Sequence, residues 1–127
     1  MKATELQIGN IVKYRGSICK VYSIESPMPR EDRRFDNKYI VTLFCNGLIV
    51  ARIEEIQHVI LTKEMLKENG FSPFGNDAWA VGHYELIRDM RIHIGALSMS
   101  VAYVHQLQNA LRLCKYDDLA DNFKVNI

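Results

Sequence analysis

Short runs of apolar and β-branched residues, separated by glycine turns, fill the first sixty residues of the chain. Residues 8–24 follow this pattern on both sides of Gly16, and residues 39–53 follow it around Asn46-Gly47. Asn-Gly between such runs is the strongest short-range hairpin signal, because both central residues of a type I′ turn need a positive φ. We therefore predict two hairpins in a small curled, SH3-like antiparallel sheet over residues 1–60.

A two-residue Asn46-Gly47 loop fixes the expected register of the second hairpin. Under this register Cys45 pairs with Leu48, Phe44 with Ile49, and Leu43 with Val50. One face then carries Val41, Leu43, Cys45, Leu48 and Val50, and the other carries Ile40, Phe44, Ile49 and Ile53. Because both faces are apolar, we expect both to be covered, one by the inside of the curled sheet and the other by a helix.

Residues 61–71 carry the start and stop signals of that short helix. Thr62 suits the N-cap, and Glu64 complements the helix dipole in the first turn. Gly70 suits the left-handed C′ position, and Phe71 suits the hydrophobic contact of a Schellman motif. A helix of about two turns is not stable alone, so we expect packing to hold it.

The second half of the chain changes from alternating to helical spacing. Apolar runs predict strands within residues 78–86, 90–94 and 97–103. A helix is predicted from the recurrence of Val104, Leu107, Leu111 and Cys114, and the tail is expected to fold back through Leu119, Phe123 and Val125.

The pattern as a whole predicts an α+β protein. The curled sheet forms one subdomain over residues 1–60, and residues 61–127 form a second, in which a further antiparallel sheet is closed by a C-terminal helix. At 127 residues, the two parts also fit within one compact domain.

Composition narrows the function classes only a little. A net charge of +1 gives no electric field strong enough to require nucleic acid as the partner.

The three cysteines, Cys19, Cys45 and Cys114, are odd in number and far apart in the sequence. This spacing argues against a disulfide framework or a zinc site, so we expect free, buried thiols. The N-terminus has no apolar signal region and no run is long enough to span a bilayer, so a cytoplasmic location without a membrane partner is expected.

Catalytic and metal-binding patterns have little support. His83 and His93 face each other only if their strands are neighbours, and two unconnected surface residues explain them as well. The carboxylate pairs Glu54-Glu55 and Asp117-Asp118 diverge on either a strand or a helix. We therefore predict no enzymatic activity, no metal and no cofactor.

The surface that best suits a function is basic and aromatic. The residues predicted to contact nucleic acid lie on the first hairpin and on the charged loop that follows it: Lys13, Tyr14, Arg15, Lys20, Arg30, Arg33, Arg34 and Lys38. Bases stack on aromatic rings, and phosphates attract cations. Glu31, Asp32 and Asp36 offset the charge of the same loop, so a solvated loop without a partner is the alternative.

The start of the last helix offers a second surface. Tyr103, His105, Gln106 and Asn109 combine aromatic and amide groups, as protein interfaces often do. Helix capping and core packing are the alternative explanation of these residues.

Three segments form a recognisable combination: Ile8-Gly9-Asn10, then Leu61-Thr62 with Glu64, Leu66, Gly70 and Phe71, and finally Tyr103-Val104-His105-Gln106-Leu107-Gln108-Asn109. Together they resemble an uncharacterised family of small proteins from gut Bacteroidota, their phages and mobile elements. The chain departs from the family at residues 110–116, where a Thr-Gly turn is usual. No enzymatic activity comes with the family, so the resemblance implies a phage or mobile-element context.

These features favour a non-enzymatic module that binds nucleic acid or a nucleoprotein. Fold-level analogy carries much of this prediction. The alternative is a structural or adaptor protein that self-associates or binds a protein partner through its edge strands or final helix.

Overall fold

The computed structural model describes residues 5–25, 40–75, 77–81 and 85–125. The chain divides into an N-terminal unit, Met1–Val59, and a C-terminal unit, Ile60–Ile127. Each unit has its own antiparallel sheet.

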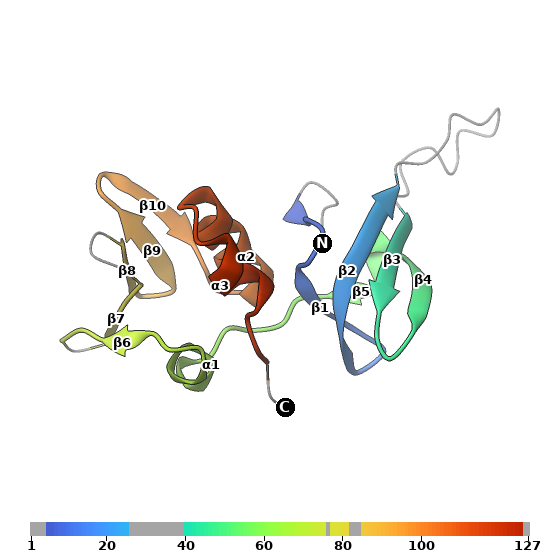
Figure 1. The fold of residues 1–127 in the computed structure, drawn as a ribbon, viewed down its shortest axis with the longest axis horizontal. Helices are drawn as coiled ribbons and strands as arrows, with labels where there is room; N and C mark the ends of the chain where they lie inside the picture. Colours follow the sequence, from blue (N-terminus) through green and yellow to red (C-terminus); the bar gives the residue numbers. More distant parts are fainter. Residues whose placement is uncertain (1–4, 26–39, 76, 82–84, 126–127) are drawn as a thin grey trace. The chain divides into compact units, whose positions relative to one another are not determined.

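The N-terminal unit is a five-stranded sheet that curls into an SH3-like half-barrel (Figure 1). Its strands lie in the order β4-β3-β2-β1-β5 and have these bounds: β1 Ile11–Tyr14, β2 Ser17–Glu25, β3 Ile40–Phe44, β4 Leu48–Arg52 and β5 Ile56–Gln57. A 3₁₀ turn, Ile53–Glu55, leads into β5. The α+β class and the curled sheet agree with the prediction from the sequence.

The first hairpin forms around Arg15 and Gly16, as predicted. Tyr14 pairs with Ser17, and the two loop residues have φ values of 49° and 81°. Positive φ at both positions is the type I′ geometry whose twist matches that of the strands. Side chains from all five strands then meet inside the curl, where Val12, Val41 and Leu43 are completely buried.

The predicted register of the second hairpin is wrong by one residue. Phe44 pairs with Leu48 and Thr42 with Val50, so the loop contains three residues instead of two. Asn46 still has a left-handed φ of 63°, and Gly47 has φ 151°. The slip moves the side chains of Leu48 and Val50 from the core face of the sheet to its outer face.

The expectation of free thiols is wrong for two cysteines. Lys20 pairs with Phe44, which places Cys19 and Cys45 side by side on β2 and at the end of β3. Their Cα atoms are 4.7 Å apart, and the sulfur atoms form a disulfide. Cys114 has a free thiol. The sequence gives no sign of this pairing because the partners are 26 residues apart.

The C-terminal unit contains a second five-stranded sheet, in the order β10-β9-β8-β7-β6 (Figure 1). The strands are β6 Ser72–Pro73, β7 Ala78–Ala80, β8 Glu85–Arg88, β9 Arg91–Ile94 and β10 Leu97–Ser100. The helices are α1 Lys63–Glu68, α2 Val104–Leu113 and α3 Asp117–Asp121, and the two C-terminal helices pack against the sheet. The predicted strand over residues 78–86 is divided between β7 and β8, which pair with each other.

Helix α1 has the predicted caps. The Thr62 Oγ1 atom accepts a hydrogen bond from the Met65 amide at 3.3 Å. At the other end, the Phe71 amide donates to the Leu66 carbonyl at 3.0 Å and the Gly70 amide to the Lys67 carbonyl at 3.2 Å. This pair of bonds is a Schellman motif, with Gly70 at φ 84°.

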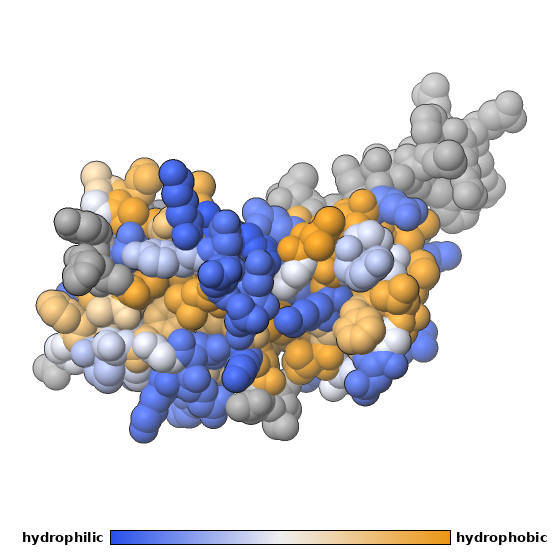
Figure 2. All heavy atoms as spheres, viewed as in Figure 1, coloured by the Kyte–Doolittle hydropathy of each residue, from blue (hydrophilic) through white to orange (hydrophobic). Residues whose placement is uncertain are grey.

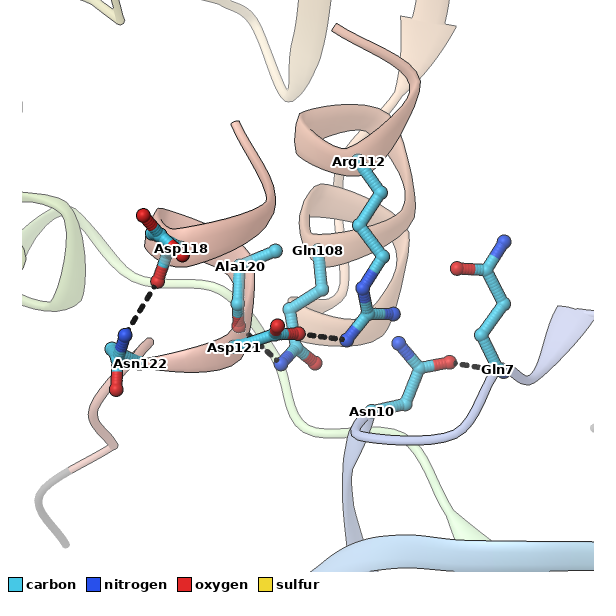
Figure 3. A network of polar contacts seen from close by, with 8 residues as sticks. All are labelled: Gln7, Asn10, Gln108, Arg112, Asp118, Ala120, Asp121 and Asn122. Atoms are coloured by element: carbon cyan, nitrogen blue, oxygen red, sulfur yellow. Dashed lines mark hydrogen bonds and ion pairs between the residues drawn. The ribbon is translucent and has the colours of Figure 1, made fainter. Parts of the chain in front are cut away.

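Polar side chains join the two C-terminal helices (Figure 3). The buried Gln108 amide of α2 donates to the Ala120 carbonyl of α3 at 3.0 Å. Arg112 forms an ion pair of 3.1 Å with Asp121. None of the helices in the described part of the chain is long and apolar enough to cross a membrane.

Candidate functional site

The outer face of the N-terminal sheet carries exposed aromatic and apolar side chains. Side chains alternate along a strand, so the neighbours of the buried Val21 and Leu43 point away from the core. Phe44 is 54% exposed, Leu48 59% and Val50 67%. Figure 2 shows hydrophobic side chains gathered on the surface over β3 and β4. Among its described residues, the N-terminal unit has no α-helix over this face, and the helix expected there, α1, belongs to the C-terminal unit.

A β-bulge adds a second aromatic ring to this face. Val21 pairs with Leu43 but Ser23 pairs with Thr42, so Tyr22 is the extra residue on β2. The residues of a bulge redirect side chains, and Tyr22 is 60% exposed.

Lys20 is a neighbour of both aromatic residues, Tyr22 and Phe44, in the sheet. It is directly opposite Phe44 across β2 and β3, and it is two residues from Tyr22 along β2. All three side chains are exposed. We call Lys20, Tyr22 and Phe44 the aromatic–lysine patch. Two accessible rings beside an ammonium group are suited to stacking on planar groups that carry negative charge.

The predicted basic residues of the first hairpin lie on one face of the sheet and in the turn. Lys13 pairs with Ile18, which places Lys13 on the same face as Lys20. Arg15 is in the turn, where its guanidinium lies 5.2 Å from the centre of the Tyr14 ring and 3.9 Å from Glu55.

Tyr14 is not available for base stacking, contrary to the prediction. It alternates with Lys13 and therefore faces the core, where it is only 8% exposed. The predicted contacts Arg30, Arg33, Arg34 and Lys38 lie outside the described residues, as does His83.

The predicted protein-interaction residues form the start of α2. Gln106 Oε1 accepts a hydrogen bond from the Tyr103 amide at 3.2 Å, which is half of a capping box. The His105 ring stacks on the Tyr103 ring, with centroids 6.0 Å apart. Asn109 is half-buried further along the helix. Helix capping therefore gives Tyr103 and Gln106 a structural role at the start of α2.

Sequence patterning alone does not identify Phe44 and Tyr22 as neighbours on an exposed face. The incorrect register paired Phe44 with Ile49, on a face expected to be covered by a helix. The bulge that exposes Tyr22 has no sequence signature here.

Comparison of the chain with protein-family models, curated proteins and solved structures gave no match.

Proposed function

We propose that this protein is a non-enzymatic binding module whose N-terminal unit binds single-stranded nucleic acid through the aromatic–lysine patch. The observation that carries the proposal is the cross-strand pair of Lys20 and Phe44, with Tyr22 beside it on the same exposed face. Stacking of a base on an aromatic ring contributes roughly 1–3 kcal/mol. Two rings on a curled sheet are the kind of platform that unpaired bases use.

The charges near the patch set the expected strength of binding. Lys13 and Lys20 share the outer face, and Arg15 lies at the tip of the same hairpin. Each phosphate neutralised on a single strand contributes about −0.7 to the slope of log affinity against log salt. Three contacts predict a slope of about −2. Stacking, which depends little on salt, then supplies much of the remaining affinity.

Fluorescence anisotropy with labelled single-stranded and duplex oligonucleotides at several salt concentrations tests the proposal. We expect tighter binding of the single strand. Phe44→Ala should weaken binding about tenfold or more because a stacking ring is lost. Lys20→Ala should reduce the salt slope by about 0.7.

Matched controls come from the other unit. Phe74 is 60% exposed and Lys67 is exposed on α1, so Phe74→Ala and Lys67→Ala remove the same groups from residues that do not belong to the patch. They should leave affinity unchanged. Absence of binding at low salt, or equal losses in the patch variants and the controls, would contradict the proposal.

A protein-binding role is the second candidate, and the exposed edge strand favours it. β4 is at the edge of its sheet and exposes the apolar side chains of Leu48 and Val50. Such edges pair with strands of other chains unless charge or a bulge prevents it. A concentration-dependent dimer that Val50→Lys disperses, together with no affinity for nucleic acid, would favour this adaptor role. The family resemblance adds a phage or mobile-element context to either candidate.

A further inference from the structure

A pocket of about 320 Å³ lies within the C-terminal unit. It is formed by the start of α1, the strands β7 and β8, and the turn that follows β8. Its volume is at the small end of the range of about 300–1,000 Å³ that is typical of ligand sites. This size suits a ligand with a single ring.

One wall of the pocket is aromatic and apolar. Trp79, the only tryptophan of the chain, lines it together with Ile87 and Met90. Ile87 is directly opposite Trp79 on the neighbouring strand. Trp79 is half-buried, and its side chain makes no ring contact or hydrogen bond with another residue in the described ranges. An indole and a thioether side by side provide good contacts for a planar ring.

The charged groups of the pocket leave one cation and one anion for a ligand. Lys63 Nζ and Asp77 Oδ1 are 3.2 Å apart and pair with each other. Arg88 and Asp89 also line the pocket and form no ion pair with any residue that the structure describes. A ligand that carries both a negative and a positive group would complement both side chains.

The two-residue turn between β8 and β9 places a methionine where glycine is usual. Asp89 has φ 53° and Met90 has φ 59°, which is type I′ geometry, and this geometry favours aspartate at the first position and glycine at the second. The Met90 carbonyl accepts a hydrogen bond from the amide of Val101, the residue that follows β10, at 2.8 Å. Strained residues of this kind concentrate at ligand-binding sites.

We infer that this pocket binds a free aromatic α-amino acid. The ring would lie against Trp79 and Met90, the carboxylate near Arg88, and the ammonium group near Asp89. This inference is independent of the nucleic-acid proposal, because every residue that it uses is in the C-terminal unit.

The single tryptophan makes the test direct. In a ¹H–¹⁵N correlation spectrum of the full chain, one indole N–H peak reports on the pocket. We would titrate L-phenylalanine, 3-phenylpropionate, which lacks the ammonium group, and phenethylamine, which lacks the carboxylate. L-phenylalanine should shift the Trp79 peak with the highest affinity. No shift at millimolar concentrations, or equal affinities for the three compounds, would overturn the inference.

Two charge variants locate the groups. Arg88→Gln should weaken the binding of phenylalanine and phenylpropionate about fivefold and leave phenethylamine unchanged. Asp89→Asn should weaken phenylalanine and phenethylamine by a similar factor and leave phenylpropionate unchanged. Lys67→Gln, which changes an exposed charge outside the pocket, is the control and should have no effect. If both pocket variants affect all three compounds alike, the assignment of the charges is wrong.

Discussion

The side chain of Asn69 and the backbone of Lys124 exchange two hydrogen bonds across 55 residues of sequence. Asn69 Nδ2 donates to the Lys124 carbonyl at 2.8 Å, and the Lys124 amide donates to Asn69 Oδ1 at 2.7 Å. Asn69 is also the C-cap of α1, where its Nδ2 donates to the Met65 carbonyl. One amide group therefore ends a helix and holds the tail of the chain.

Replacement of Asn69 by alanine should lower the free energy of unfolding by about 1–2 kcal/mol, since these bonds are largely exposed to solvent. Urea unfolding measures the change. Hydrogen exchange should also show faster exchange of the Lys124 amide. Asn122→Ala is the control, because Asn122 Nδ2 makes one local bond to the Asp118 carbonyl. An effect no larger than that of the control would argue against a role for Asn69 in holding the tail.

The disulfide predicts the number of thiols that react in the unfolded, non-reduced protein. Only Cys114 should react, whereas all three cysteines should react after reduction. Loop-closure entropy for a separation of 26 residues gives a stabilisation of about 3.5 kcal/mol. Cys45→Ser should therefore lower stability far more than Cys114→Ser. Three reactive thiols before reduction would contradict the pairing.

Tyr116 should ionise at a higher pH than a free tyrosine. The Tyr116 hydroxyl donates to Glu85 Oε2 at 2.9 Å, and this hydrogen bond raises the pKa of Tyr116. A raised pKa means that folding favours the protonated phenol. Its stabilising contribution is therefore complete below the ordinary tyrosine pKa and is lost as pH rises through the folded-state value.

Absorbance titration of the phenolate measures this directly. Glu85→Gln should return the late-ionising tyrosine to the ordinary range, because the carboxylate no longer disfavours the phenolate. Tyr116→Phe should remove that transition. A late transition that persists in Tyr116→Phe would assign it to another tyrosine.

Replacement of Met90 by glycine should raise the stability of the protein and weaken ligand binding. A left-handed non-glycine residue costs roughly 1–2 kcal/mol, and the greater freedom of glycine in the unfolded chain offsets part of the gain. Met90→Gly should therefore raise stability by up to about 1 kcal/mol and weaken the binding of an aromatic ring.

Gly95 in the next hairpin is the reciprocal control. It has φ 58°, and no heavy atom beyond its two chain neighbours lies within 4 Å of the position that an alanine Cβ would take, so Gly95→Ala adds backbone strain without a clash. The lower freedom of alanine in the unfolded chain offsets part of this strain, and the variant should be destabilised by up to about 1 kcal/mol. If Met90→Gly is also destabilising, the turn is not strained in the folded protein.

Features that depend on a few neighbouring residues were predictable from the sequence. Thr62 and Gly70 define both ends of α1, because a cap bonds to amides and carbonyls within one turn. Gly16 marks the first hairpin because a type I′ turn depends on the φ values of its central residues. The alternating and helical spacings then indicated the α+β class.

Features that depend on pairing between distant segments were not predictable. One additional loop residue exposed Leu48 and Val50, and the pairing of β2 with β3 joined Cys19 to Cys45. The bulge at Tyr22 and the pocket around Trp79 arise in the same way. Hydrophobic patterning determines that a segment becomes a strand with an apolar face, because this preference depends on the spacing of apolar residues within the segment. Register and cross-strand neighbours depend on the packing of the whole sheet, so only the tertiary structure decided which side chains form the candidate sites.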